Sequence, residues 1–311
     1  MIELKSRWSV VVPTNRREQY EKVFYPAWKP LFEKHDVQLF PVFDEPKTWR
    51  KLPWFIPRRT DMIRSWGFYE AWKAGSEYTL TLDDDVLPRG DVFAAYEYEF
   101  ERPSVCSPYL SVGSLTTSSL QMRGFPYGDR AGARVAVQYG GWEGVLDYDA
   151  ATQLACSTPS YECFSSVVLP VPHGVPATTC IMNAAHRTEL APLMWQLPML
   201  DGKFNRFGDI WSGLIQKKFL DLTGEVMLVN GRASVKHQRA SNAFANLERE
   251  APGCEINETL WDSLGAVDGF EFAGNSATYR AITSVFASVF PEDYAQRFLL
   301  ARDEWLELFG W

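Results

Sequence analysis

Three consecutive aspartates, Asp83 to Asp85, directly follow the apolar run Tyr78–Leu82. Adjacent carboxylates repel one another, and partial burial raises their free energy further unless a cation lies nearby. A divalent ion such as Mg²⁺ or Mn²⁺ removes this cost, and phosphate oxygens can complete its coordination shell. Side chains alternate along a strand, so Asp83 and Asp85 share one face and are the predicted metal ligands. Asp84 is a predicted nucleotide contact. An acidic turn in solvent is the alternative, which the position after a strand disfavours.

His237 is the predicted third metal ligand and lies far along the chain, in the sequence SVKHQRASN. Imidazole suits Mn²⁺ better than Mg²⁺. Lys236 and Arg239 flank it and can neutralise the oxygens of a diphosphate. A histidine that only donates hydrogen bonds, within a solvated basic turn, is the alternative for this segment.

Two further segments carry groups that could act on a sugar. Asp209 begins the helical stretch DIWSGLIQKKF, where it is either a helix cap or a carboxylate that contacts sugar hydroxyls. Arg123 and Arg130 flank turn residues, and arginines in a loop are plausible partners of anions. A solvated surface loop is the alternative for both arginines. Asp209 is therefore a candidate active-site carboxylate, and Arg123 and Arg130 are candidate partners of the diphosphate.

An alternation of strands and helices must position the aspartates. Trp8–Val12, Val37–Phe43 and Tyr78–Leu82 are predicted strands, and the segments Arg17–Lys34 and Thr60–Ala74 between them are predicted helices. This order is typical of a parallel sheet, in which ligands bind outside the carboxyl ends of the strands. Besides Asp84, Lys236 and Arg239, the nucleotide contacts predicted at that edge are Thr14, Asn15, Arg16, Asp44 and Arg64.

The rest of the chain shows no internal repeat and no clear linker. Loops and short strands are expected from residue 104 to 174, and Lys47–Pro57 is also expected to be a loop. A helix over Asp209–Leu222 and a strand over Val226–Val229 are predicted next. The last segment, Asn275–Phe309, is predicted to be helical with a break at Pro291. We expect a catalytic domain over residues 1–270 and a C-terminal helical extension, residues 271–311, packed on it.

Composition restricts the class of protein. The 311 residues have an ordinary globular composition and a net charge of −8, which disfavours broad contact with nucleic acid. Five scattered cysteines are typical of reduced thiols in the cytoplasm. No signal peptide is visible, and no stretch approaches the roughly 20 apolar residues that cross a bilayer. The expected location is cytoplasmic, with no membrane span.

Taken together, these motifs resemble one family, the plant reversibly glycosylated polypeptides, also called UDP-arabinopyranose mutases. The resemblance covers about four fifths of the chain. Its segments are VVVPTNR from Val10, TLDDD from Thr81, RGFPYGDR from Arg123, GGWEGVLDYDAATQL from Gly140, CIMNAAHR from Cys180, DGKFNRFGDIW from Asp201 and HQRASNAFANL from His237.

The resemblance implies an α/β fold of the GT-A type, with a mixed, mostly parallel sheet flanked by helices. It implies a UDP-sugar substrate and Mn²⁺ or Mg²⁺ at the aspartates and His237. It also implies that Arg123 is reversibly glycosylated and that Arg130 is needed for activity. The implied reaction interconverts the pyranose and furanose forms of UDP-arabinose. The chain departs from the family where Gly208-Asp209 replaces two aspartates.

Three functions remain open from the sequence. The favoured one is a UDP-sugar mutase. The second is a glycosyltransferase that moves a sugar to an external hydroxyl, for example on a hydroxymethylated DNA base of a phage or bacterium. Arg58-Arg59 and Lys217-Lys218 are candidate DNA contacts, although the net charge of −8 makes DNA a partner that is not favoured. The third is a non-enzymatic carrier of UDP-sugar. The oligomeric state is also open, and a homo-oligomer is one option.

Overall fold

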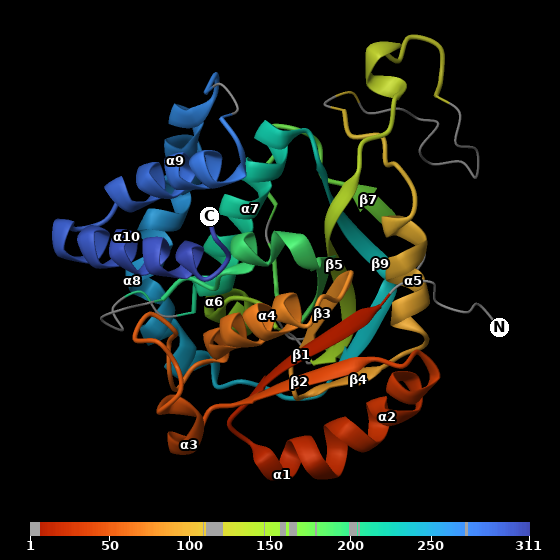
Figure 1. Ribbon diagram of the computed structural model, residues 1–311, viewed down its shortest axis with the longest axis vertical. Helices are drawn as coiled ribbons and strands as arrows, with labels where there is room; N and C mark the ends of the chain where they lie inside the picture. Colours follow the sequence, from red (N-terminus) through yellow and green to blue (C-terminus); the bar gives the residue numbers. More distant parts are fainter. Residues whose placement is uncertain are drawn as a thin grey trace.

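One mixed sheet forms the centre of the structure, and helices cover its two faces (Figure 1). The computed structural model describes residues 7–107, 109, 121–145, 147–155, 160–161, 167–177, 179–198, 204, 206–270 and 273–311. The strands in these residues are β1 (Trp8–Thr14), β2 (Gln38–Phe43), β3 (Tyr78–Leu82), β4 (Val86–Pro88), β5 (Val135–Val145), β6 (Ser160–Tyr161), β7 (Val168–Pro170), β8 (Asn183–Arg187) and β9 (Val226–His237). The predicted α/β class is confirmed.

The strand directions decide which loops meet. The order of the sheet is β2-β1-β3-β8-β5-β9-β4. β1 pairs in parallel with β2 and β3, and β5 pairs in parallel with β9. β8 is antiparallel to both β3 and β5, so β5 and β9 run in the same direction as β1, β2 and β3. The carboxyl ends of these five strands therefore lie at one edge, as expected for a mostly parallel sheet.

The helices agree with the predicted ones where the hydrophobic pattern is strong. They are α1 (Arg17–Gln19), α2 (Tyr25–Lys34), α3 (Pro46–Trp49), α4 (Arg64–Lys73), α5 (Val92–Phe100), α6 (Ala150–Ala155), α7 (Gly208–Thr223), α8 (Ala243–Leu264), α9 (Asn275–Ser288) and α10 (Glu292–Glu307). A π-helical turn joins α1 to α2, so the helix predicted before the second strand is continuous. Pro291 separates α9 from α10 where the break was predicted.

Four elements, α3, β5, α6 and α8, differ from the sequence-based expectation. The predicted loop Lys47–Pro57 begins within helix α3, because Pro46 stands at the first helical position, where a missing N–H has no cost. Between residues 104 and 174 the long strand β5 and helix α6 replace part of the expected loop region. Helix α8 was not predicted, because Pro252 and Gly253 lie inside it and weaken its helical signal.

Alternation along β1 divides the core between the two faces of the sheet. Val10 and Val12 pack with aromatic residues of α2 and α5 in one cluster. Val11 belongs to the other cluster, which contains residues of α4, α7, α9 and α10. The C-terminal helices α9 and α10 thus share their hydrophobic core with the helices that cover the sheet. Among the described helices, none combines the length and the apolar character that crossing a bilayer requires.

Gly67 allows α4 to lie directly against the sheet. A Cβ atom at this position would lie 2.3 Å from Val11 Cγ1 and 2.9 Å from Val42 Cγ2, both of which are buried side chains. We expect Gly67→Ala to lower the free energy of unfolding by about 1–3 kcal/mol, measured by urea denaturation. Gly265→Ala is the control, since its Cβ would meet only Asp268 Oδ2 at 3.7 Å. Equal stability of the two variants would contradict this close packing.

Candidate functional site

A cleft with a volume of about 1500 Å³ opens at the carboxyl ends of the parallel strands. Residues at or after the ends of β1, β2, β3, β5 and β9 line it, together with the beginning of α7 and one side of α8. Of the predicted site residues, the cleft is lined by Thr14, Asn15, Arg16, Asp44, Asp83, Asp84, Asp85, Asp209, His237 and Arg239. The topology thus brings together residues that are more than 220 positions apart in the chain.

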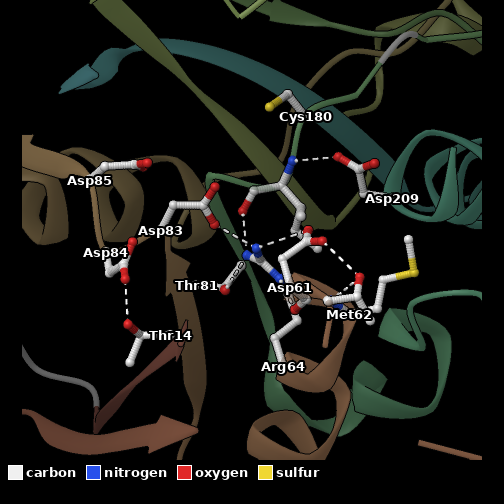
Figure 2. Close-up of polar contacts among 12 residues, drawn as sticks. Thr14, Asp61, Met62, Arg64, Thr81, Asp83, Asp84, Asp85, Cys180 and Asp209 are labelled. Carbon is white, nitrogen blue, oxygen red and sulfur yellow. Dashed lines mark hydrogen bonds and ion pairs between the residues drawn. The ribbon is translucent and has the colours of Figure 1, made fainter. Parts of the chain in front are cut away.

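In Figure 2 the side chains of Asp83 and Asp85 extend toward the same side, whereas Asp84 is bonded to Thr14 below them. β3 ends at Leu82, and the chain turns so that the N–H of Val86 donates to the carbonyl of Asp83. The aspartates thus lie in the turn after β3 and not within the strand, and Asp83 and Asp85 both line the cleft. Each carboxylate has its own set of partners.

Asp84 anchors the loop that follows β1. Its carboxylate accepts hydrogen bonds from Thr14 Oγ1 and from the Arg16 guanidinium (Figure 2 shows the Thr14 bond). Burial raises the pKa of Asp84 above its usual value, although the bonds from Thr14 and Arg16 oppose the shift. This contact places Arg16 at the mouth of the cleft, where a cation can face a diphosphate.

Asp85 is the carboxylate that faces His237. Arg239 Nε donates to Asp85 Oδ2 over 2.8 Å, and Arg16 donates to the same oxygen over 3.0 Å. Although burial opposes it, the hydrogen bond from Arg239 and the nearby His237 hold the pKa of Asp85 below its usual value. Asp85 Oδ1 is buried and has no hydrogen-bond partner among the described residues. That oxygen lies 3.9 Å from His237 Nε2.

An unpartnered carboxylate oxygen opposite an imidazole nitrogen is a donor set that fits a divalent ion such as Mn²⁺. The Nδ1 atom of His237 lies 3.0 Å from the carbonyl of Val145, which orients Nε2 toward Asp85. In the described part of the chain, no group of three or more His, Cys, Asp or Glu side chains converges on one point. Ligand oxygens would have to complete the coordination shell.

Arg64 lies fully buried beneath the cleft and organises the far side of the site. Its guanidinium donates to Asp83 Oδ1 and, over 3.0 Å, to Thr81 Oγ1. It also donates to the carbonyls of Ile181 and Asp61 (Figure 2). Arg64 was predicted as a nucleotide contact, but the structure places it as a support for Asp83 below the cleft surface. Burial raises the pKa of Asp83 to about 6, although Arg64 opposes the shift.

Asp209 stands on the wall opposite the diphosphate-facing residues. Its Oδ2 accepts a 3.4 Å hydrogen bond from the N–H of Ile181, so the carboxylate spans from α7 to the segment before β8. Burial, then the charge of Asp61, raise the pKa of Asp209 to about 7. Asp209 is therefore not the helix cap, because Phe207 holds that position and the carboxyl group of Asp209 lines the cleft.

The raised pKa of Asp209 predicts that the difference in stability between wild type and Asp209→Asn depends on pH. The folded state holds a proton that the unfolded state loses above about pH 4, so the wild-type chain loses stability as the pH rises from 4 to 7. Asp209→Asn lacks this loss. We expect its free energy of unfolding, relative to wild type, to rise by about 2–4 kcal/mol between pH 4 and pH 8. Denaturant titrations at both pH values measure it, and a constant difference would contradict the burial of this carboxyl group.

Sequence reasoning missed Asp61 and Cys180, both of which line the cleft. Asp61 begins a 3₁₀ turn that leads into α4, with Thr60 as its cap. Its position three residues before Arg64 was a usable signal, since such residues are neighbours on a helix. The thiol of Cys180 donates to Asp147 Oδ2 over 3.4 Å. Burial, then Asp147, raise the pKa of Cys180 above its usual value, so the thiol is not a reactive thiolate.

Of two further predicted nucleotide contacts, Asp44 lines the cleft and Lys236 does not. Lys236 is exposed and does not line the cleft among the described residues, because it neighbours His237 on β9 and so faces the other way. Asp44 lines the cleft, and its Oδ1 accepts hydrogen bonds from Trp49 Nε1 over 2.5 Å and from the N–H of Arg59 over 3.0 Å. Asp44 therefore shapes the loop at the end of β2.

Arg123 and Arg130 lie in the segment that leads into β5. Because β5 runs parallel to β3, its start at Val135 lies at the sheet edge opposite the aspartates. Arg130 donates to the carbonyl of Phe125 over 2.9 Å and stacks on Tyr127, while Arg123 is exposed. Neither arginine lines the cleft in the described residues, so the catalytic role suggested for them stays a prediction.

The candidate DNA contact Lys217-Lys218 is not a surface patch. Both lysines are buried, with 1% and 4% of their surfaces exposed, and they pair with Asp221 and Asp268. Helix α7 carries both lysines into the core. The prediction that Lys217-Lys218 contacts DNA is therefore wrong, because buried, ion-paired lysines cannot reach a DNA backbone.

Comparisons with known proteins match this chain to one family. The model of the family described as "Reversibly glycosylated polypeptide" matches residues 114–278, which is more than half of the chain. UDP-arabinopyranose mutase 1 of Oryza sativa subsp. japonica is 27% identical over 83% of this chain and 77% of its own length. UDP-arabinopyranose mutase 3 of Arabidopsis thaliana is 28% identical over 80% of this chain and 75% of its own.

Solved structures resemble the chain only distantly. One is the crystal structure of a glycosyltransferase involved in glycosylation of the major capsid of PBCV-1, with a TM-score of 0.38 and 10% identity over 78% of this chain and 97% of that one. Another is A197 from STIV, with a TM-score of 0.38 and 11% identity over 76% of this chain and 87% of that one.

Proposed function

This chain belongs to the reversibly glycosylated polypeptide family, and on that premise we propose that it binds a UDP-sugar in the cleft and interconverts pyranose and furanose forms of UDP-arabinose. The observation that carries the proposal is the meeting of Arg16, Asp85, His237 and Arg239 at one sheet edge, beside a second group of carboxyl side chains. Cations suited to a diphosphate thus adjoin groups suited to a sugar.

The diphosphate end of the cleft is the place for a metal ion. Asp85 and His237 would hold Mn²⁺ or Mg²⁺, and Asp83 can add the carboxylate oxygen that Arg64 does not take. When bound, the ion would offset the charge of the diphosphate as it leaves and returns. Arg16 and Arg239 add positive charge on the same side and orient the phosphates by hydrogen bonds.

The sugar end of the cleft carries two carboxyl groups that differ in burial, the exposed Asp61 and the more buried Asp209. Asp209 is the group proposed to act on the sugar, because its pKa of about 7 lets it donate or accept a proton near neutral pH. Tyr139 and Trp142 of β5 line the same cleft, and aromatic faces suit the apolar faces of sugar rings.

The proposed glycosylation of Arg123 fits transfer between two copies of the chain better than transfer within one. Arg123 precedes β5 at one sheet edge, and the cleft lies at the other. A homo-oligomer in which Arg123 of one copy reaches the cleft of another satisfies both positions. Mixing inactive Arg123→Ala with inactive Asp85→Ala would then restore activity, whereas a mixture without activity would contradict transfer between copies.

The direct test of the function is incubation of the protein with UDP-arabinopyranose and Mn²⁺, followed by chromatography. The furanose form is the expected product. Thermal shift with UDP-sugars, with and without Mn²⁺, reports binding separately, because a ligand that binds only the folded state raises its stability. Binding of UDP-sugar without formation of the furanose at saturating substrate would contradict the mutase proposal. The cleft would then be a UDP-sugar site without mutase activity.

A glycosyltransferase acting on an external hydroxyl is the second candidate, and the size of the cleft favours it. Binding sites for small molecules usually have volumes of about 300–1000 Å³. The cleft measures about 1500 Å³ and continues along one side of α8, past Asn257 and Trp261. Transfer of labelled sugar from the UDP-sugar to an added acceptor, including hydroxymethylated DNA, separates this candidate from the mutase.

A further inference from the structure

Asp61 and Asp209 lie on two elements that touch each other beside the cleft. Asp61 opens the 3₁₀ turn before α4, and Asp209 stands in the first turn of α7. Gly208 permits the contact, because a Cβ atom there would lie 2.3 Å from Met62 Cε and 3.0 Å from the carbonyl of Leu197. The fold thus holds the two carboxyl groups on neighbouring walls of one cavity, and both line it.

One buried cation holds this arrangement in place. Arg64 Nε donates to the carbonyl of Asp61 over 3.1 Å, and Arg64 Nη2 lies 3.4 Å from Asp61 Oδ2. The same guanidinium binds the carbonyl of Ile181, whose N–H donates to Asp209. Figure 2 shows Asp61, Arg64 and Asp209 around the residues that precede β8. Arg64 therefore fixes Asp61 directly and Asp209 through the backbone of Ile181.

The two carboxyl groups differ in their access to water. The side chain of Asp61 is 54% exposed, whereas Asp209 is largely covered. Two neighbouring carboxyl groups in unlike surroundings tend to hold one proton between them, with the buried group protonated. Other groups near Asp209 are Arg64, Tyr139, Asp147 and Cys180. Of these groups only Arg64 is a cation, and it pairs with Asp83 and Asp61.

We propose that Asp61 and Asp209 are the acid–base pair of this cleft, exchanging a single proton with the sugar while Arg64 acts as their positioning residue. The inference rests on the UDP-sugar function proposed above and assigns the proton transfers within it. Asp61 is a new catalytic candidate, and the substrate it implies is a pyranose with a free hydroxyl on C4, the carbon next to the one that joins the ring oxygen to the rest of the chain.

The proposed steps balance in atoms and charge. As the ring opens, the bond between C1 and the ring oxygen breaks, its electron pair stays on that oxygen, and the oxygen takes the proton of Asp209. The opening leaves a positive charge on C1. The atom outside the ring through which C1 is attached to its carrier stabilises this charge with its lone pair. As the new ring closes, a sugar hydroxyl oxygen bonds to C1, and its proton passes to Asp61. Proton transfer from Asp61 to Asp209 restores the starting state.

Titration of the labelled carboxyl groups tests the pair without any turnover. In the full-length protein with ¹³C-labelled aspartate, NMR should show Asp209 titrating near pH 7, with its signal assigned by its loss in Asp209→Asn. Asp61→Asn should move this titration to lower pH, because the neighbouring negative charge is removed. An Asp209 signal that titrates near the ordinary value of about 4, or that ignores Asp61→Asn, would overturn the pair.

Kinetics test the catalytic role. We expect Asp61→Asn and Asp209→Asn each to lower kcat by about 10²–10⁴-fold with little change in KM. The wild-type rate should fall above pH 7, and Asp209→Asn should lose that dependence. Asp293→Asn, at an exposed aspartate of α10, is the control and should match wild type. Wild-type kcat in either cleft variant would overturn the inference.

Failure of the underlying function gives a different result. A wild-type protein that binds UDP-sugar but forms no furanose would contradict the mutase, while the NMR titration would still decide whether Asp61 and Asp209 share a proton. A loss of UDP-sugar binding in both variants would assign the two residues to binding and would also overturn their acid–base role.

Discussion

Arg64→Met should lower the free energy of unfolding by about 3–5 kcal/mol at pH 8, because it leaves buried carboxylate charge without its partner. Arg64 has no exposed surface and binds Asp83, Asp61 and the carbonyl of Ile181. Methionine fills much of the volume but supplies none of the five N–H donors of a guanidinium. The variant should also lose activity, because both ends of the cleft depend on this side chain.

The loss of stability in Arg64→Met should depend on pH. Burial raises the pKa of Asp83 to about 6 even with Arg64 present, and removing the cation raises that pKa further. At pH 5 the folded variant keeps Asp83 neutral, so the missing ion pair costs less. As the pH rises above 6, ionising Asp83 becomes steadily more unfavourable. Urea denaturation at pH 5 and pH 8 should therefore show the larger loss at pH 8.

Arg302→Met provides the matched control. Arg302 is also a buried arginine, but it bonds to Asp303 and to groups of α9, far from the cleft residues. This variant should lose stability and still bind UDP-sugar at a temperature where it is folded. If Arg64→Met behaved in the same way and kept wild-type activity, the organising role of Arg64 would be refuted.

The second large effect concerns Asp85 and His237. Asp85→Ala and His237→Ala should each lower kcat/KM by about 10³-fold or more, a loss of about 4 kcal/mol in transition-state stabilisation. The reason is that Asp85 Oδ1, which has no hydrogen-bond partner among the described residues, faces His237 Nε2 over 3.9 Å, so each variant removes one of the two proposed metal ligands. The thermal shift that UDP-sugar gives with Mn²⁺ should disappear in both variants.

Lys236→Ala is the control for His237→Ala. The two residues are consecutive on β9, but Lys236 is exposed and lies outside the cleft lining. Its replacement should change kcat/KM by less than about threefold. Equal losses in both variants would point to a general effect on β9, and an unchanged Mn²⁺-dependent shift in His237→Ala would remove it from the proposed metal site.

The sequence alone predicted the position of the candidate site. Local patterns placed β1, β2 and β3 correctly, and parallel strands bring their carboxyl ends to one edge. That was enough to predict that Thr14, Asp44 and Asp83 would meet, because strand direction and burial follow from short-range hydrophobic patterning. The distinctive spacing of the family motifs added His237 to the same edge.

The role of each side chain was decided only by the tertiary structure. The turn after Leu82 sends Asp83 to Arg64 and Asp85 to His237, and no periodicity rule describes a turn. Asp61 and Asp209 line the same cleft because Gly208 lets α7 approach Met62, a contact between segments about 150 residues apart.

The position of Arg123 is the largest difference between what the sequence predicts and what the tertiary structure shows. Its motif suggests catalysis, but β8 is inserted antiparallel between β3 and β5, so the chain enters β5 at the edge opposite the aspartates. Hydrophobic patterning fixes which residues form a strand, because burial of side chains is a local property of the sequence. Strand order and direction arise from pairing between distant segments, and only the folded chain determines on which side of the sheet Arg123 lies.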